Sequence, residues 1–362
     1  MAPSTGSLRD PFPHLQRCVY LDTAAAGLTW QGHGAAVARF YDEVKSRGYD
    51  ARPEWQAMTR RVRERLAAWM GVASADLTFV SNTTEALNHV ALGLRLSPGD
   101  RIVLADDEFP SVLRPWAHAA EAGAEIVHVP VTHQATRGAA LLAAIDDRTR
   151  VLAVSHTHSS TGTTLALPPL VAACRAHDAL LVVDGIQALG AVPVDLAGVD
   201  VYAASFFKWM LSGFGIGVLV TSPRARARLR PAFLGYANES DPSELQYAHV
   251  NIPAMYGLDA TLDFLEQVGW AVIHARVRDL GAHLVAGARA RGLDLVTPPD
   301  ACAGIYVLRC ADGEGAVRAL GERGIRVSAR GPGIRIAPHY YNTPEEVDAC
   351  LDTFARLAAP RG

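Results

Sequence analysis

Lysine is almost absent from this chain: Lys45 and Lys208 are the only two among its 34 lysines and arginines. Arginine keeps its proton at any working pH, whereas lysine can lose it and act as a base or a nucleophile. Lys45 lies in the charged stretch YDEVKSRGYD, which is typical of a solvated helix face. Lys208 lies in the apolar stretch YAASFFKWM, where an ammonium group is unfavourable unless it is ion-paired, deprotonated or covalently bound. Lys208 is therefore either an ion-paired core lysine or a catalytic residue.

Paired cysteines, excess charge and long apolar runs are also missing. The 5 cysteines are scattered and form no CxxC pair, which indicates a reducing compartment and argues against a disulfide framework or a zinc site. A net charge of -3 gives no electrostatic attraction for nucleic acid or a membrane surface. No apolar run has the length of a membrane span, and the N-terminus lacks the apolar segment of a signal peptide. We therefore expect a cytoplasmic protein with no nucleic-acid partner and no membrane partner.

Short apolar runs alternate with amphipathic segments along most of the chain, which has 362 residues. Strands that are buried on both faces and separated by helices are typical of a doubly wound, mostly parallel sheet. After two expected helices, 31–46 and 53–70, we predict seven strands of an α/β fold: Leu77–Val80, Arg101–Ala105, Glu125–Val129, Val151–Ser155, Leu180–Asp184, Val199–Ser205 and Ile216–Val220. A helix near 253–268 then leads into a smaller C-terminal α+β domain with strand-like runs IYVLR and IRVSA.

Polar residues at the carboxyl ends of these strands are the candidates for chemistry, because ligands of open α/β sheets bind there. Asn82, Thr83 and Thr84 follow the first strand and open a helix. The free amides and the dipole of a helix N-terminus, together with the threonine hydroxyls, suit a phosphate group. The same residues could equally serve only as an N-cap.

Two further strand ends carry Asp184 and Phe109. A carboxylate at the end of an apolar strand needs a cation, and a protonated pyridine nitrogen is one such partner. Asp184 could instead cap the following turn, and Gln187 could hydrogen-bond a neighbouring phenolate oxygen. Phe109 offers a ring for stacking at the same edge, or it belongs to the core.

In this order along the chain, five motifs resemble the fold-type I pyridoxal 5'-phosphate (PLP) enzymes, specifically the class V aminotransferase group that includes cysteine desulfurases and isopenicillin N epimerase. The resemblance covers roughly residues 19–341. The matching segments are YLDTAAAG at the start, NTTEALN at the phosphate loop, EFPSVLRPW at the stacking loop, VDGIQALG and AASFFKWM. NIPAMYGLDATLDFL resembles the family's dimer-contact helix.

The resemblance implies a role for each matching residue. Lys208 would form the internal aldimine with PLP and move protons at the substrate's α-carbon, and Asp184 would keep the pyridine nitrogen protonated. Gln187 would contact the ring oxygen, and Phe109 would stack on the ring. Arg335, in GIRIAPHYYNTPEEVD, would bind the substrate carboxylate through its bidentate guanidinium, unless it is an ordinary surface arginine. The phosphate would be held by Asn82, Thr83, Thr84 and Ser205.

The resemblance also implies an organisation. We expect an N-terminal segment, 1–21, that packs on the small domain, a PLP-binding large domain, 22–255, and a small C-terminal domain, 256–362. A homodimer with a shared active site is expected, acting on a small amino-acid substrate. No metal is expected, because His156 and His158 share one face of a strand without an evident third ligand.

Departures from the family pattern guide the prediction of the reaction. Desulfurases carry a loop cysteine before the carboxylate-binding arginine, but this chain reads VSARGPGIRIAP there, so we predict that it is not a cysteine desulfurase. Phe109 and Phe207 stand where the family often has histidine. Lys208 is then the one evident proton carrier, which suits β-elimination or a 1,3-proton transfer better than two-base epimerisation.

We therefore predict C–S β-elimination of an S-substituted cysteine, in secondary-metabolite, antibiotic or thiol biosynthesis. The chain is similar to the cysteine-less branch of the family that includes natural-product C–S lyases. Transamination is the next alternative, followed by epimerisation and by decarboxylation-coupled deamination. A PLP-fold binding protein without turnover is the alternative from another class, and the complete set of Lys208, Asp184 and Arg335 argues against it.

Overall fold

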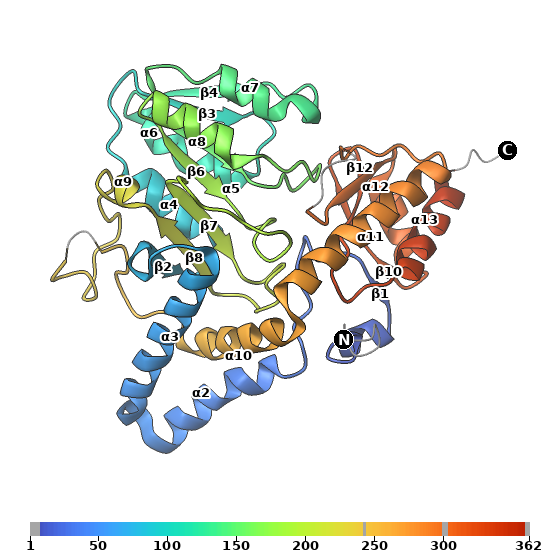
Figure 1. Cartoon of the computed structure of the whole chain (residues 1–362), viewed down its shortest axis with the longest axis horizontal. Helices are drawn as coiled ribbons and strands as arrows, with labels where there is room; N and C mark the ends of the chain where they lie inside the picture. Colours follow the sequence, from blue (N-terminus) through green and yellow to red (C-terminus); the bar gives the residue numbers. More distant parts are fainter. Residues whose placement is uncertain (1–7, 242–243, 299–302, 359–362) are drawn as a thin grey trace.

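The computed structural model describes residues 8–241, 244–298 and 303–358. Residues 1–7 of the predicted N-terminal segment, and Cys302, lie outside these ranges. Figure 1 shows a large α/β part and a smaller C-terminal part, with helix α11 (Trp270–Ala290) running from one to the other.

The large part is built on one sheet with the strand order β2-β8-β7-β6-β5-β3-β4. β8 is antiparallel to both of its neighbours, and all other neighbouring pairs are parallel. The sheet confirms the predicted fold class, a large doubly wound, mostly parallel seven-stranded sheet. Its strands are β2 (Leu77–Val80), β3 (Arg101–Ala105), β4 (Glu125–Val129), β5 (Thr149–Ser155), β6 (Leu180–Asp184), β7 (Val201–Ser205) and β8 (Gly217–Thr221).

Apart from the edge strand β4, which is only partly buried, the strands of this sheet are buried on both faces. This burial explains why they are mostly apolar runs in the sequence. β3 sends Val103 and Ala105 into one hydrophobic cluster and Ile102 and Leu104 into another. The first cluster also takes residues from the helices α3 (Arg52–Met70), α8 (Leu167–Ala176) and α10 (Ile252–Val268), and the second takes residues from α4 (Thr83–Gly93). The sheet is thus held between two apolar layers, and its strand ends are positioned rigidly.

The helices surround the sheet and continue into the C-terminal part (Figure 1). α3 begins with Pro53 in its first turn and ends at Gly71, which has a left-handed φ of 68°. The other α-helices in the described residues are α2 (His33–Arg47), α5 (Pro110–Leu113), α6 (Ala117–Glu121), α7 (Arg137–Ala143), α9 (Pro223–Arg226), α12 (Gly313–Gly321) and α13 (Pro344–Ala358).

The C-terminal part has its own small sheets and its own core. β9 (Tyr306–Arg309), β11 (Ser328–Arg330) and β12 (Gly333–Ile336) form an antiparallel sheet in the order β11-β12-β9. β1 (Val19–Tyr20) pairs in parallel with β10 (Ile325–Arg326), and Leu21 belongs to the apolar cluster of this part. The run IRVSA, expected as one strand, therefore divides between β10 and β11. The domain division at residue 255, which falls inside α10, stays a prediction.

None of the helices in the described part of the chain is both long and apolar enough to cross a membrane. The cytoplasmic location and the homodimer stay predictions.

Gly162 lies where the two parts meet, and we expect that Gly162→Ala destabilises the protein by about 2 kcal/mol or more. Its φ is 75°, and an added Cβ would lie 2.1 Å from the carbonyl oxygen of Ile305 in the C-terminal part. Urea unfolding measures the change. Gly34→Ala is the matched control, because an added Cβ there meets nothing within 4 Å and the residue lies in α2, so no loss is expected. Equal stability of Gly162→Ala and wild type would contradict the close contact.

Candidate active site

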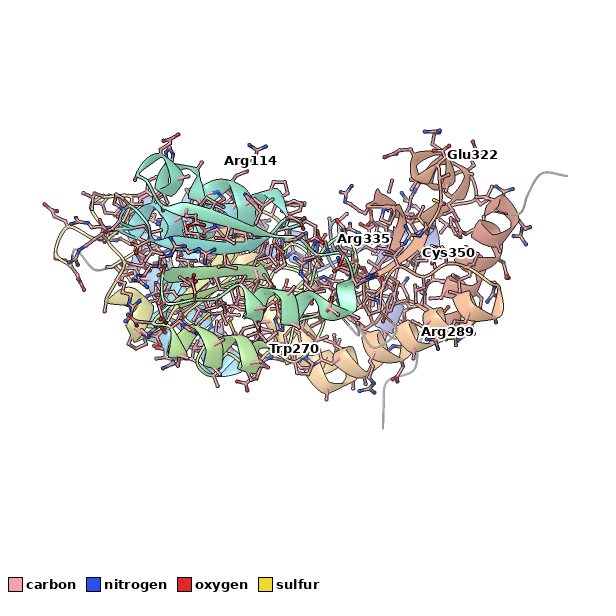
Figure 2. The ribbon with its side chains drawn as sticks, turned by 90° about the horizontal axis from the view of Figure 1, so that it is seen from above. Arg114, Trp270, Arg289, Glu322, Arg335 and Cys350 are labelled. Carbon is pink, nitrogen blue, oxygen red and sulfur yellow. The ribbon has the colours of Figure 1, made fainter. Side chains whose placement is uncertain are left out.

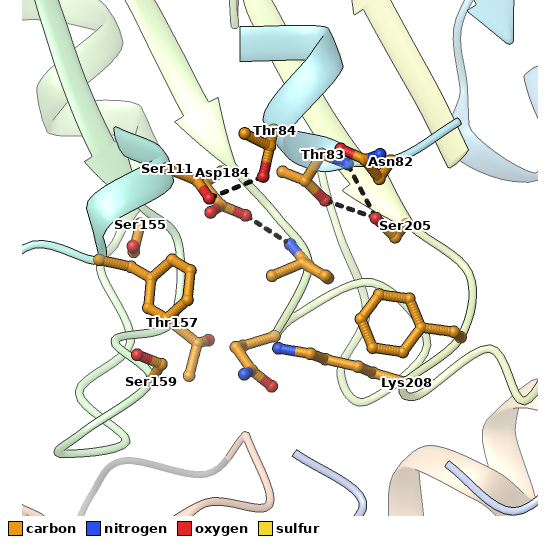
Figure 3. Close-up of a pocket in the computed structure, with 14 residues that line it drawn as sticks. Asn82, Thr83, Thr84, Ser111, Ser155, Thr157, Ser159, Asp184, Ser205 and Lys208 are labelled. Carbon is orange, nitrogen blue, oxygen red and sulfur yellow. Dashed lines mark hydrogen bonds between the residues drawn. The ribbon is translucent and has the colours of Figure 1, made fainter. Parts of the chain in front are cut away.

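A pocket lies at the carboxyl ends of β2, β3, β5, β6 and β7, where the sequence places its candidate residues (Figure 3). Every predicted site residue except Arg335 lines it, although the residues come from distant segments. The lining residues that the sequence predicted are Asn82, Thr83, Thr84, Phe109, Asp184, Gln187, Ser205 and Lys208.

One end of the pocket is formed by the N-terminus of α4. The Thr83 amide donates to Ser205 Oγ at 2.8 Å, and the two hydroxyls of Thr83 and Ser205 lie 2.9 Å apart. Asn82 caps the helix by accepting from the Glu85 amide at 2.9 Å. Within the described residues the amide of Thr84 has no hydrogen-bond partner. A free amide, several hydroxyls and the helix dipole together make this end suitable for a phosphate.

Asp184 ends β6 and is only 4% exposed. Its Oδ1 accepts from the Ile186 amide at 3.0 Å, and the described residues provide no other hydrogen bond to the carboxylate. Burial raises the pKa of Asp184, while the Ile186 amide and the charge of Lys208 oppose that rise. A buried carboxylate with free acceptor capacity toward a pocket is suited to a cationic ligand atom.

Gln187 lines the pocket, but both ends of its amide already have protein partners. Nε2 donates to the carbonyl oxygen of Ala24 at 3.0 Å, and Oε1 accepts from Trp209 Nε1 at 3.0 Å. One N–H of the amide is left for a ligand, because a side-chain amide nitrogen carries two hydrogens. The predicted contact with a ring oxygen therefore depends on that single hydrogen and stays a prediction.

Lys208 follows β7, and its amine points into the middle of the pocket (Figure 3). In the described part of the chain it has no ion-pair partner, and its Nζ lies 5.6 Å from the centre of the Phe207 ring. Burial lowers the pKa of Lys208, and the charge of Asp184 opposes that shift. A lysine with a lowered pKa loses its proton more readily and can then act as a nucleophile and a base.

Arg335 is not on the pocket wall. It lies on β12 where the two parts meet (Figure 2), and it is 2% exposed. Its Nη1 donates to the carbonyl oxygen of Ser159, which lines the pocket, at 3.2 Å. Its Nη2 lies 3.3 Å from Asp22 Oδ1, and its buried Nε has no partner in the described residues. The guanidinium is thus next to the pocket, with hydrogen-bonding capacity left over.

Several lining residues were not predicted. Ser155 ends β5, Thr157 and Ser159 follow it, and Ser111 lies 2.8 Å from the Thr84 hydroxyl at the start of α5. All four lie at or after the carboxyl ends of predicted strands, so the strand-end rule could have found them. The sequence offers no signal that separates these serines and threonines from ordinary loop residues.

His156 and His158 have separate surroundings. The His158 ring lies 2.8 Å from the Thr161 hydroxyl and 2.8 Å from the carbonyl oxygen of Asp107. Burial lowers the pKa of His156 to about 4, and its Nδ1 has no partner in the described residues. No group of three or more His, Cys, Asp or Glu side chains in the described ranges is arranged to hold a metal ion.

A lysine and a buried carboxylate that face one pocket, beside a helix N-terminus at the carboxyl edge of a doubly wound sheet, define a PLP enzyme of fold type I. Residues 19–350 match the model of the aminotransferase class-V family. The chain belongs to this family, is a PLP-dependent class V aminotransferase-like enzyme, and uses PLP as its cofactor.

Known proteins resemble the chain over most of its length. It is 32% identical over 340 residues to the isopenicillin N epimerase of Streptomyces clavuligerus, and the match covers 84% of each chain. The structure of a cysteine desulfurase from Thermococcus onnurineus NA1 gives a TM-score of 0.89 at 22% identity, over 99% of both chains. The cystine C–S lyase C-DES gives 0.88 at 24% identity, over 95% of this chain and 99% of its own. The two structures support the fold.

The pocket fits PLP on the chemistry of its own residues. The α4 terminus offers a free amide and hydroxyls to a phosphate, and Asp184 keeps a free acceptor for a ring nitrogen. Phe109, which is 46% exposed, presents apolar surface to a ring in the same pocket, and Lys208 offers an amine.

The two lysines allow a matched test of covalent attachment. Lys208→Ala should abolish PLP bound covalently after borohydride reduction, measured as added mass on the intact protein, and should abolish turnover. Lys45→Ala should retain both, because Lys45 is a surface residue with a 79% exposed side chain. Covalent PLP on the Lys208→Ala protein would assign the attachment to another amine.

Proposed function

We propose that this enzyme is a C–S lyase that eliminates a thiol from an S-substituted cysteine. The proposal is carried by one observation: Lys208 and Asp184 are the only side chains with an acidic or basic group among the described residues that line the pocket. Asp184 is proposed to pair with the ring nitrogen. Lys208 alone is then left to move protons at the substrate carbon.

The roles proposed for the lining residues follow from their positions. Asn82, Thr83, Thr84 and Ser205 would hold the phosphate at the α4 terminus, and Phe109 would cover one face of the ring. When bound, PLP withdraws electrons from the α-carbon of the substrate and so makes its C–H bond acidic. Lys208 would accept that proton because burial lowers the pKa of its amine.

In the elimination, Lys208 takes the α-proton and the Cβ–S bond breaks, with its electron pair leaving on sulfur. Lys208 then returns a proton to the departing thiolate. The net reaction converts an S-substituted cysteine and water into a free thiol, pyruvate and ammonium. A single proton carrier is sufficient, because removal and return of the proton occur on the same side of the substrate.

The other lining residues favour a substrate in which the group attached to the cysteine sulfur is uncharged. Ser111, Ser155, Thr157 and Ser159 are polar and uncharged, and Ile186 and Phe207 are apolar. A charged substituent would find no counter-ion among the described lining residues other than Lys208 and Asp184, which both have other proposed roles.

The proposal also excludes the cysteine desulfurase mechanism, which needs a reactive thiolate. Burial raises the pKa of all four described thiols, and to about 12 for Cys174 and Cys350. None of these four thiols lines the pocket. A thiol with a raised pKa is mostly protonated at neutral pH and is a poor nucleophile.

Epimerisation at the α-carbon is the second candidate. It is favoured by the likeness to isopenicillin N epimerase, at 32% identity over 84% of the chain. Two-base epimerisation needs a second proton carrier on the opposite face of the substrate, and the described lining residues do not supply one.

Mass spectrometry of PLP-loaded enzyme with a panel of S-alkyl and S-aryl cysteines and common amino acids separates the candidates. We expect pyruvate and free thiol in equal amounts, and none with the Lys208→Ala protein. A keto acid that keeps the substrate side chain would make the enzyme a transaminase. Deuterium uptake at the α-carbon without other products would make it an epimerase, and a persulfide on the protein would make it a desulfurase.

Arg335 is proposed to bind the substrate carboxylate, and its contact with Asp22 would hold the guanidinium in place. Arg335→Ala should raise KM for amino-acid substrates by about tenfold or more, with a smaller change in kcat, because a charge-assisted hydrogen bond to the substrate is lost. Arg309→Ala is the control, because Arg309 lies on the neighbouring strand β9 with a 54% exposed side chain that pairs with Asp294. Steady-state kinetics with both variants measures the difference. An unchanged KM in Arg335→Ala would place the carboxylate site elsewhere.

A further inference from the structure

A fully buried ion pair lies behind the pocket and has no part in the reaction described so far. Arg137, at the start of α7, donates through Nη2 to Glu108 Oε1 at 2.6 Å, and both side chains are 0% exposed. Its other arm, Nη1, donates to Asp107 Oδ1 at 2.5 Å. A buried ion pair is weak evidence for a stabilising role, since apolar residues of similar volume often serve stability as well. Its location therefore suggests a function.

Glu108 connects this pair to the pocket through Ser155. Glu108 Oε1 accepts from the Ser155 amide at 3.0 Å, and Oε2 accepts from the Ser155 hydroxyl at 2.5 Å. Ser155 is the last residue of β5, lines the pocket, and lies opposite Asp184 in the β5–β6 register. The Glu108 carboxylate is thus hydrogen-bonded to Ser155, the residue next to Asp184 in the sheet.

Two effects follow from this arrangement. Glu108 immediately precedes Phe109, so its contacts with Arg137 and Ser155 hold the loop that carries the ring-covering side chain. Its negative charge also acts on Asp184, and it is among the causes of the raised pKa of that carboxyl. Charges in a buried region are weakly screened, so the effect reaches the ligand atom that Asp184 faces.

We propose that Glu108 is a positioning residue for the cofactor: its carboxylate, paired with Arg137, adds negative charge behind Asp184 and favours a protonated ring nitrogen. The inference rests on the proposed pairing of Asp184 with that nitrogen. The charged and titratable groups near Glu108 and Asp184 are Arg137, Asp107, His156, His158, Tyr202 and Lys208.

Glu108→Gln tests the inference through cofactor affinity. Dissociation constants are measured on cofactor-free protein for PLP and for its 1-deaza analogue, in which the ring nitrogen is replaced by C–H. Loss of the charge should weaken PLP binding at least about threefold and leave the binding of the analogue unchanged, because only PLP presents a nitrogen to Asp184. An equal loss for both ligands would reduce Glu108 to a structural residue and overturn the inference. No loss for either ligand would overturn it too.

Asp200→Asn is the matched control. Asp200 is another buried carboxylate of the same sheet, 1% exposed, and it bonds to the Leu181 amide at 3.0 Å and to Arg224 at 2.9 Å. It precedes β7, at the end of the sheet opposite the pocket. Asp200→Asn should leave the ratio of the two dissociation constants at the wild-type value. A change in that ratio equal to the change in Glu108→Gln would contradict a local effect.

Asp184→Asn separates this inference from the proposed function. If Asp184→Asn lowers the preference for PLP over the analogue but Glu108→Gln does not, the inference about Glu108 is wrong and the role of Asp184 stands. If Asp184→Asn leaves the preference unchanged, the role proposed for Asp184 is wrong, and the inference falls with it.

Discussion

Lys208 and Asp184 bring opposite charges into one pocket without an ion pair between them in the described structure. Burial favours the neutral form of each, because it raises the pKa of the acid and lowers that of the amine. Each group is therefore free to interact with a ligand, and a single ligand could interact with both. PLP, with a cationic ring nitrogen at one end and an aldehyde at the other, is such a partner.

The rest of the fold positions these two groups. Parallel strands end at one edge of the sheet, so residues from β2, β3, β5, β6 and β7 meet there although they are far apart in the sequence. Both faces of the sheet are covered by apolar clusters, which makes the strand ends rigid. Behind the pocket, Arg137 and Glu108 form a buried ion pair next to these strand ends.

Family membership and reaction type are separate questions in this protein. The fold and the pocket place the chain in the aminotransferase class V family, and relatives with that fold include an isopenicillin N epimerase and a cysteine desulfurase. PLP withdraws electrons from the α-carbon of an amino-acid substrate, so the outcome depends on which side chains can carry a proton or a sulfur atom. The proposal of C–S elimination follows from the lining residues, among which only Lys208 is proposed to carry a proton.

The sequence by itself determined the strands and most of the pocket. β2, β3, β4 and β6 have the predicted bounds. For β2, β3 and β6 the reason is that a buried strand is a continuous apolar run. Asn82, Asp184 and Lys208 could be found because the strand-end rule and the scarcity of lysine are local properties of the chain.

Only the tertiary structure decided which partners these residues have. Gln187 bonds to Ala24, Arg335 lies against Asp22, and Glu108 reaches Ser155, over separations of 163, 313 and 47 residues. Such contacts are set by the packing of whole elements against one another, which no local pattern of residues encodes.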